Sequence, residues 1–349
     1  MRHTLLALCL SSIAATGAHA HAQQSWTAAP SGTSAELRGL SVVTASVAWA
    51  SGARGTVLRT TDGARWQAIS VPGADKLDFR DIHAVDANTA LVMSAGPGAA
   101  SSIWRTIDGG AAWRQVALNG YPGGFWDSMA FWDSNNGIVF GDPVQGKFQV
   151  YVTADGGANW REVQASGLEA QKDEGAFAAS GTAVTVSGER DAWIATGGAE
   201  KARVLRSSDR GATWRAASLP IPAAAPGKGI FSVGFHDANN GMAVGGDYKQ
   251  PLLASVNGAR TENGGTSWTP AAVLPTGYMS VVLPVPGAPR AFVAGGLAGS
   301  GYSTDGGKTW TVLDRTAINT VGFASPAIGW AVGPKGLLMK YSGPALDKP

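Results

Sequence analysis

Nine polar and aromatic residues lie at positions where they could together form a binding or catalytic site. They are Arg38, Arg80, Asp81, Trp126, Asp127, Asp142, Glu174, Asp247 and Tyr278. Carboxylates can act as acids, bases or nucleophiles in glycoside hydrolysis, and arginines can bind an anionic substrate. If the charged side chains among these residues converge in one narrow opening, they are unfavourable without partners. We therefore expect them either to pair with one another or to bind a ligand. Asp142 and Asp247 follow short apolar strands, where each could cap a loop or contact that ligand.

Other chemistries find little support in the sequence. The histidines past residue 22 are His83 and His236, which lie far apart in the chain, and we expect both to be structural rather than metal ligands. The single cysteine, Cys9, lies in a segment that we expect to be removed, which excludes thiol chemistry from the mature chain. No glycine-rich loop opens a helix and no P-loop occurs. We therefore expect neither a metal nor a cofactor.

A repeated turn organises the rest of the chain. Tryptophans follow an Asp-Gly turn at positions 66, 113, 160, 214, 268 and 310, with spacings of 47, 47, 54, 54 and 42 residues. Periods of this length are typical of propellers and solenoids. The acid of each turn can accept hydrogen bonds from its own backbone, so we predict a structural role for all six positions. These positions are Asp62, Asp108, Asp155, Asp209, Asn263 and Asp305.

A second motif, a turn followed by a short apolar strand that ends in glycine, occurs seven times, for example at 136–141 and 240–245. The missing seventh Asp/Trp turn is split between the chain ends, because the strand at 337–342 stops where the Asp should follow and Ser25-Trp26-Thr27 matches Thr309-Trp310-Thr311. The sequence therefore predicts an all-β fold, a seven-bladed β-propeller closed by an N-terminal strand that joins the last blade. Closure removes exposed strand edges.

The predicted propeller spans residues 23–342, and residues 343–349 form a C-terminal tail. The strand that follows each Trp-to-Trp linker should be the innermost strand of its blade, and its first residues should meet at the mouth of the central channel. These starts are Arg38, Arg80 with Asp81, Trp126 with Asp127, Glu174, Ser232, Tyr278 and Asn319. The two 54-residue repeats carry extra sequence, which we place at 165–175 and 219–229, and such insertions often mark a docking face.

The composition and the N-terminal segment indicate the class of partner and the cellular location. The 349 residues carry 27 Lys+Arg and 25 Asp+Glu, a formal charge of +2, which argues against a nucleic-acid partner. Residues 1–22 have the charged start, apolar centre and Ala-x-Ala end of a signal peptide, cleaved after Ala20 or Ala22. We therefore expect a periplasmic or secreted protein. Its apolar runs are too short for stable membrane insertion.

The turns at Ser207–Trp214 and Ser303–Trp310 resemble the Asp-box, Ser-x-Asp-x-Gly-x-Thr-Trp, of bacterial sialidases and related propellers. The spacing, the leader and the split seventh repeat resemble the photosystem II assembly factor family, the Ycf48-like proteins with BNR (Asp-box) repeats. This resemblance covers the whole mature chain. It implies a scaffold that holds another protein during assembly, so we expect a protein-binding or assembly function with a protein or a glycan as partner.

The alternative is a sialidase-like glycoside hydrolase or lyase. Sialidases use three arginines, a Tyr–Glu pair and an acidic Asp, and this sequence offers Arg38, Arg80, Asp127, Glu174 and Tyr278 in plausible blades. The third arginine is missing from the expected strand starts. Asp81, Asp127 and Glu174 could still supply the two carboxylates that general glycoside hydrolysis requires. We therefore favour binding over catalysis.

Overall fold

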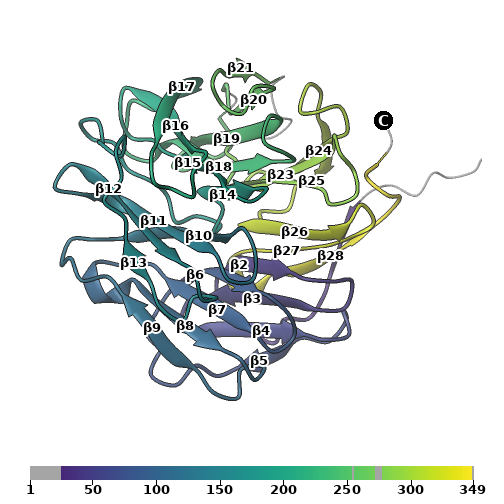
Figure 1. Ribbon diagram of the computed structural model, residues 1–349. Coiled ribbons are helices and arrows are strands. Elements are labelled where there is room, and N and C mark those ends of the chain that lie inside the picture. The colour runs from purple at the N-terminus through teal and green to yellow at the C-terminus, as the bar shows by residue number, and fades with distance from the viewer. Residues whose placement is uncertain (1–24, 254, 272–276, 348–349) are drawn as a thin grey trace, which may run out of the picture.

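The computed structural model describes residues 25–253, 255–271 and 277–347, and these fold into seven four-stranded antiparallel sheets. The sheets are arranged around a centre as the blades of a propeller, with β2, β6, β10 and β14 close to that centre (Figure 1). The predicted seven-bladed β-propeller is confirmed. The predicted signal peptide, with both cleavage sites, lies outside the described residues. No helix in the described part of the chain has the length and apolar character needed to cross a membrane.

The blades follow one another along the chain. Blade 1 contains β2 (Leu37–Val42), β3 (Ala48–Gly52), β4 (Thr56–Thr60) and β5 (Gln67–Ile69); blade 2 contains β6 (Phe79–Ala84), β7 (Ala90–Ser94), β8 (Ser102–Thr106) and β9 (Arg114–Leu118). Blade 3 contains β10 (Trp126–Phe131), β11 (Gly137–Val144), β12 (Lys147–Thr153) and β13 (Arg161–Glu162); blade 4 contains β14 (Val184–Ser187), β15 (Asp191–Ala195), β16 (Lys201–Ser207) and β17 (Arg215–Pro222).

Blades 5 to 7 complete the ring. Blade 5 contains β18 (Lys228–Phe235), β19 (Gly241–Asp247), β20 (Gly258–Thr261) and β21 (Thr269–Pro270); blade 6 contains β22 (Val281–Pro284), β23 (Phe292–Gly296), β24 (Gly299–Ser303) and β25 (Thr311–Asp314). Blade 7 contains β26 (Thr320–Ser325), β27 (Ile328–Val332), β28 (Leu338–Ser342) and the N-terminal β1 (Ser25–Ala28). Two short 3₁₀ turns, Gly98–Ala100 and Pro334–Gly336, lie between strands.

The N-terminal strand closes the ring as the sequence predicts. β1 pairs with β28, and Trp26 lies opposite Tyr341. The Trp26 side chain is buried against Phe323 and Tyr341, with ring centroids 5.8 and 5.7 Å away, and its indole N–H donates to Ser300 Oγ of blade 6 at 3.0 Å. This tryptophan therefore joins the two ends of the chain and also attaches blade 7 to blade 6.

The Asp-boxes form the turns between the third and fourth strands of the first six blades. In blade 4, Asp209 Oδ1 accepts a hydrogen bond from the Thr213 N–H at 2.9 Å and from the Ser207 hydroxyl at 2.7 Å. Gly211 has a φ of +85°, which favours glycine, and its carbonyl accepts the Trp214 indole N–H at 2.9 Å. The turn therefore satisfies its own polar groups and positions a tryptophan that packs between blades.

The other Asp-boxes repeat these contacts. Asn263 Oδ1 accepts from the Ser267 N–H at 3.0 Å and from the Thr261 hydroxyl at 2.9 Å, so a neutral amide can fill the position. Backbone N–H groups of their own turns also donate to the remaining acids, which are Asp62, Asp108, Asp155 and Asp305. Hydrogen bonds from Asn159 outweigh a small effect of burial and lower the pKa of Asp155 to about 2.

Polar side chains also connect the innermost strands of neighbouring blades. The connections, in ring order, are Ser41 Oγ to the Ala84 N–H, Asp81 to the Met129 N–H, Ser128 Oγ to the Val184 N–H, Thr182 Oγ1 to Ser232 Oγ, Ser232 Oγ to the Val282 N–H, Ser280 Oγ to the Asn319 carbonyl, and Asn319 Nδ2 to the Leu37 carbonyl. Each pair of adjacent blades is joined in this way. The centre is therefore rigid, and side chains that point into it are held on fixed backbone.

Candidate functional site

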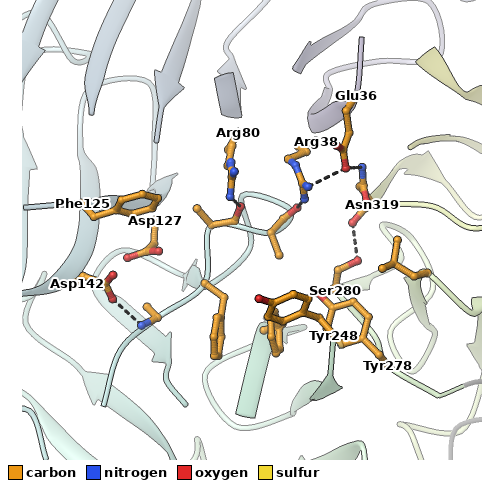
Figure 2. Close-up of a pocket in the computed structure, with 16 residues that line it drawn as sticks. Glu36, Arg38, Arg80, Phe125, Asp127, Asp142, Tyr248, Tyr278, Ser280 and Asn319 are labelled. Carbon is orange, nitrogen blue, oxygen red and sulfur yellow. Dashed lines mark hydrogen bonds and ion pairs between the residues drawn. The ribbon is translucent and has the colours of Figure 1, made fainter. Parts of the chain in front are cut away.

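A cavity of about 430 Å³ lies between the starts of the innermost strands. Because strands alternate in direction, this end of the propeller is opposite the end that carries the Asp-boxes. One wall of the cavity is polar and is formed by Glu36, Arg38, Arg80, Asp127, Asp142 and Asn319. The other wall is largely aromatic and includes Tyr248 and Tyr278 (Figure 2), together with Phe231, whose ring contacts both tyrosines, and Phe177, which stacks on Phe231. We refer to this cavity as the central pocket.

β-Bulges direct side chains into the central pocket. In blade 3, Trp126 and Ser128 oppose adjacent residues of β11, so Asp127 is the extra residue of a bulge. Arg38, Arg80 and Phe231 occupy the same place in blades 1, 2 and 5, and Asp142 is the extra residue of a bulge in β11. A bulge redirects a side chain from the regular alternation of a strand. Repetition of this device in four innermost strands concentrates charge and aromatic surface at one point.

The two arginines each form an ion pair close to the pocket. Arg38 Nη2 lies 2.7 Å from Glu36 Oε1, and Arg80 Nε lies 2.7 Å from Asp78 Oδ2. Each guanidinium also donates to a backbone carbonyl, Arg38 to Ala179 at 3.3 Å and Arg80 to Ala178 at 3.2 Å. The arginines therefore hold a piece of backbone at the pocket and are neutralised by their own partners.

That backbone belongs to the long connection between blades 3 and 4, residues 163–183, which contains the extra sequence expected at 165–175. Residues 176–179 of this connection line the central pocket. The Ala176 N–H donates to Asp142 Oδ1 at 2.8 Å, and the Phe177 ring stacks on Phe231 with centroids 3.8 Å apart. The connection is thus fixed from blades 1, 2, 3 and 5. The extra residues expected at 219–229 instead lengthen β17 and the start of β18.

Glu174 lies in the same connection, and the expectation that it begins an innermost strand is wrong, since that strand begins at Val184. Its side chain is fully buried and outside the pocket lining. Both carboxyl oxygens are occupied: Arg203 Nε donates to Oε1 at 2.8 Å, and the Gln171 N–H donates to Oε2 at 2.8 Å. Thr196 adds a third donor at 2.7 Å. Glu174 therefore fixes the connection to blade 4.

Asp127 has a different environment. Its side chain is 1% exposed, and neither carboxyl oxygen has a hydrogen-bond partner of good geometry within the described residues. Burial, reinforced by the nearby charge of Asp142 and only partly offset by Arg80, raises the pKa of Asp127 well above its usual range. Burial likewise raises the pKa of Asp142. Figure 2 shows both carboxyl groups on the same wall of the pocket.

The aromatic wall is built by blades 5 and 6. The Phe231 and Tyr278 rings pack edge to face with their centroids 4.8 Å apart, and the Tyr248 ring centroid lies 6.3 Å from that of Phe231. Burial raises the pKa of Tyr278, so its hydroxyl stays protonated. Leu252 and Leu253, in the loop that follows Tyr248, are 79% and 49% exposed. The wall therefore continues outward into exposed apolar surface.

Three other candidate residues are placed away from the central pocket. Asp81 points between blades, where the N–H groups of Met129 and Ile82 donate to it at 2.6 and 2.7 Å. Burial raises its pKa to about 8. Trp126 is buried between blades 2 and 3, against Tyr151 and in a cluster with Leu91 and Ile103, because the bulge turns Asp127 rather than Trp126 toward the centre. The expectation that Asp81 and Trp126 lie at the channel mouth is therefore wrong, since neither lines the central pocket.

Asp247 is also outside the pocket lining. Its carboxyl group accepts the Lys249 N–H at 2.9 Å and lies 3.4 Å from Lys228 Nζ. It therefore caps the loop that places Tyr248 in the wall. The two histidines are packed elsewhere: His83 stacks on Phe131 at 4.2 Å, and His236 Nε2 lies 2.8 Å from the Ala291 carbonyl.

The pocket residues that were not predicted from the sequence include four aromatic side chains. The aromatic ones are Phe125, Phe177, Phe231 and Tyr248, and the others are Glu36, Ala176, Ala178, Ala179, Ser280 and Leu297. Phe231 could have been found from the sequence, because Ile230-Phe231-Ser232-Val233 follows the same pattern as Leu37-Arg38-Gly39-Leu40. In both blocks an apolar residue is followed by a variable residue, then by a small one, then by a second apolar residue. No such pattern marks Phe177, because its position depends on the path of a long connection.

The pocket does not contain the constellation of a sialidase. Arg38 and Arg80 lie in it without a third arginine, and Glu174 is not available to pair with Tyr278. Within the described residues no group of three or more His, Cys, Asp or Glu side chains could hold a metal ion. The carboxylates that the cavity brings together are those of Asp127, Asp142 and Glu36.

Comparison with known proteins supports the fold. Residues 302–312 match the BNR/Asp-box repeat family. The chain is similar in structure to YCF48 bound to D1 peptide, with 17% identity, a TM-score of 0.64 and coverage of 91% of this chain and 96% of the other. YCF48 from Cyanidioschyzon merolae gives 19% identity, a TM-score of 0.65 and coverage of 91% and 99%. The chain is thus a seven-bladed propeller with a BNR/Asp-box repeat at residues 302–312, and it is similar to YCF48 in fold.

Enzymes share this fold as well. The GH74 xyloglucanase from Xanthomonas campestris has 16% identity and a TM-score of 0.60, and the match covers 90% of this chain but 53% of the enzyme. An ancestral GH74 enzyme gives 13% identity and a TM-score of 0.64, and this chain covers 46% of it. No curated protein matches the chain. At these identities the comparisons show the architecture alone, so function must be argued from the pocket.

Proposed function

We propose that this chain is a non-catalytic scaffold that binds a segment of another protein at the central pocket. The observation that carries the proposal is a pocket with one charged and one aromatic wall. The loop that carries the exposed side chains of Tyr248, Leu252 and Leu253 adjoins this aromatic wall, because the Tyr278 N–H donates to the Pro251 carbonyl at 2.8 Å. Aromatic anchors in a pocket with an apolar surround are typical of protein recognition. The likeness to YCF48 bound to D1 peptide supports a protein partner.

A site-specific photo-crosslinking experiment tests this proposal. A photoreactive residue at Leu252 should capture a partner protein, whereas the same residue at Ile107, which is 64% exposed and lies in an Asp-box turn, should not. Leu252→Asp should abolish capture by a probe at Tyr248, and Ile107→Asp should leave it unchanged. Equal capture from both faces, or capture insensitive to Leu252→Asp, would contradict binding at the pocket.

We also propose that the protein acts outside the cytoplasm, on the strength of residues 1–22. The order of a charged start, an apolar run and two Ala-x-Ala sites supports export. N-terminal sequencing of the protein recovered from the periplasm or medium should give His21 or Gln23 as the first residue. Recovery of the full-length chain in the cytoplasm alone would refute this proposal.

Glycoside hydrolysis is the second candidate. It is favoured by Asp127 and Asp142, two carboxyl groups with raised pKa values on one wall of a cavity, and by the likeness to GH74 enzymes. A pair of carboxyl groups of different acidity is what such a reaction needs. Release of reducing sugar from xyloglucan by the wild type, and its loss in both Asp127→Asn and Asp142→Asn, would establish this activity in place of simple binding.

A further inference from the structure

We propose that the central pocket binds a positively charged side chain of its partner, the ammonium of a lysine or the guanidinium of an arginine, between the Asp127–Asp142 wall and the aromatic wall. This inference rests on the proposed protein-binding function and names the chemical group that the pocket recognises. Four observations carry it: an unpartnered buried carboxyl group, the charge balance of the walls, the aromatic surface opposite, and the shape of the backbone that holds them.

The first observation is the unpartnered state of Asp127. Among the described residues the Asp127 carboxyl group, which is 1% exposed, has no hydrogen bond of good geometry, and the backbone N–H groups of Asp142 and Ala178 only partly offset the cost of its burial. The other buried acids show how the chain treats a carboxyl group it uses structurally. Glu174 accepts from Arg203, Thr196 and Gln171, and Asp81 accepts two backbone N–H groups. Asp127 differs from both, and it belongs to the lining of the cavity (Figure 2).

The second observation is the charge balance. Arg38 is paired with Glu36 at 2.7 Å and Arg80 with Asp78 at 2.7 Å, so these two pairs cancel. Asp127 and Asp142 then remain as two acids without a basic partner in contact. An anionic ligand would face both of them at close range. A cation would instead provide the missing charge and the missing donors together.

The third observation is the aromatic wall. The rings of Phe231, Tyr248 and Tyr278 pack against one another on the side of the pocket opposite the acids. Aromatic rings attract lysine and arginine cations, more strongly when the cation is desolvated. A neutral sugar could also stack there, but it would leave the charge of the acids uncompensated. The combination of acids and rings therefore favours a cation over a glycan.

The fourth observation is rigidity. Asp127 and Phe231 are extra residues of bulges in innermost strands, and these strands are joined to their neighbours by hydrogen bonds. Asp142 is held by the Ala176 N–H at 2.8 Å. Little conformational entropy is therefore lost when a ligand binds, which favours affinity.

Binding of a cation should be coupled to proton release. The groups that face Asp127 are the carboxyl group and backbone N–H of Asp142 from β11, Arg80 from β6, itself paired with Asp78, and the backbone N–H of Ala178 from the long connection. In the empty pocket Asp127 holds its proton to an unusually high pH, and a bound cation would favour the ionised form. Affinity should therefore increase as the pH rises, until the ligand itself loses its charge.

Selection of peptides from a random nine-residue display library tests the inference. Peptides retained by the wild type should share a lysine or arginine, and replacing it with norleucine should weaken binding about 10-fold or more. Asp127→Asn should remove this preference, while Glu189→Gln, which deletes an exposed acid in the β14–β15 turn, should preserve it. Circular dichroism would verify that both variants fold.

Retained peptides without a shared cation, or a preference that survives Asp127→Asn, would overturn the inference and leave the protein-binding function intact. Failure to retain any peptide would count against the proposed function itself. In that case titration with Nα-acetyl-lysine methylamide and its norleucine analogue, followed by NMR, decides the inference separately. Saturable shifts for the lysine compound alone, absent in Asp127→Asn, support it, and equal behaviour of the two compounds overturns it.

Discussion

The two ends of the propeller use aspartate in opposite ways. At the Asp-box end, carboxyl groups such as Asp155 and Asp209 lie near solvent, accept hydrogen bonds from their own turns, and have pKa values below the usual range. At the other end, Asp127 and Asp142 are buried in a cavity and have pKa values above it. The first group recurs from blade to blade, whereas the second occurs in blade 3 alone among the described residues lining the pocket.

This difference separates structure from recognition. A residue repeated at the same place in nearly every blade solves a problem that every blade has, namely how to satisfy the polar groups of a tight turn. A residue that occurs in one blade, and that the fold leaves unsatisfied, has no such role. The Asp-box turns should therefore contribute to stability without affecting binding, and Asp127 should contribute to binding without adding stability. Residues 163–183 should contribute to both, and four measurements test this comparison.

The largest effect should follow Trp214→Ala. Trp214 is 4% exposed and packs in the core between blades 3 and 4, so its removal leaves a large cavity. We expect a loss of about 3–5 kcal/mol in the free energy of unfolding. Urea denaturation followed by circular dichroism measures it. Binding by the remaining folded protein should be unchanged, and a binding defect in the folded fraction would contradict the separation of the two ends.

Glu174→Ala should have the next largest effect. It leaves the Arg203 guanidinium, whose side chain is 12% exposed, without its carboxylate partner and weakens the attachment of residues 163–183 to blade 4, where the backbone hydrogen bonds between Gly175 and Gly197 remain. We expect a loss of about 3 kcal/mol. Because this connection lines the pocket, ligand binding should weaken as well. A variant that loses stability and keeps full affinity would show that the connection is not required to shape the site.

The pH dependence of stability should distinguish the two sets of acids. Burial raises the pKa of Asp81 from 3.8 to about 8. The protonated Asp81 therefore makes its full contribution to the free energy of unfolding below about pH 3.8, and this contribution is lost as the pH rises toward 8. The pKa of Asp127 is also raised, with the same sign. For Asp305, burial raises the pKa, but hydrogen bonds from Thr309 outweigh this effect and lower the pKa to about 2. The contribution of Asp305 to the free energy of unfolding is therefore lost as the pH falls through about 2.

Asp127→Asn should therefore raise the melting temperature at pH 8 relative to wild type and have little effect at pH 4. Thermal unfolding across this range, with Glu189→Gln as a surface control, provides the measurement. A melting temperature that falls equally at both pH values would indicate that Asp127 has a stabilising partner. That result would argue against the interpretation that the Asp127 carboxyl group is buried in the pocket without a stabilising partner.

The smallest effect should come from Asp209→Asn. Asparagine keeps the acceptor for the Thr213 N–H and loses the acceptor for its hydroxyl, which lies 2.6 Å from Oδ2. Since Asn263 already fills the equivalent place in blade 5, we expect a loss of less than about 1 kcal/mol. Denaturant unfolding, with Asn263→Asp as the reverse exchange, measures it. A much larger loss would mean that the charge itself matters at the Asp-box end.

The fold was predictable from the sequence because the repeats carry it. The Asp/Trp turns give the period, and the match between Ser25-Trp26-Thr27 and Thr309-Trp310-Thr311 gives the closure, which the pairing of β1 with β28 confirms. Each of these signals is local and is repeated several times. The pattern therefore survives the exceptions, such as Asn263.

The pocket was predictable only in part, because it depends on features that do not repeat. Arg38, Arg80, Asp127, Asp142 and Tyr278 do line it. A bulge decides whether a residue or its neighbour faces the centre, and it depends on pairing between strands, which the sequence does not display. Glu174 was misplaced for a related reason, since the connection that carries it runs 21 residues (163–183) before β14 begins.

The closure of the ring by β1 has a consequence for biosynthesis. A ribosome makes the strand that contains Trp26 before any other described strand and makes its partner β28 after all the others. Blade 7 therefore cannot be completed until translation has reached Ser342, and every shorter nascent chain keeps an unpaired sheet edge. A premature stop before that point would yield an incomplete ring that is exposed to proteases and chaperones, so a closed propeller shows that translation has passed Ser342.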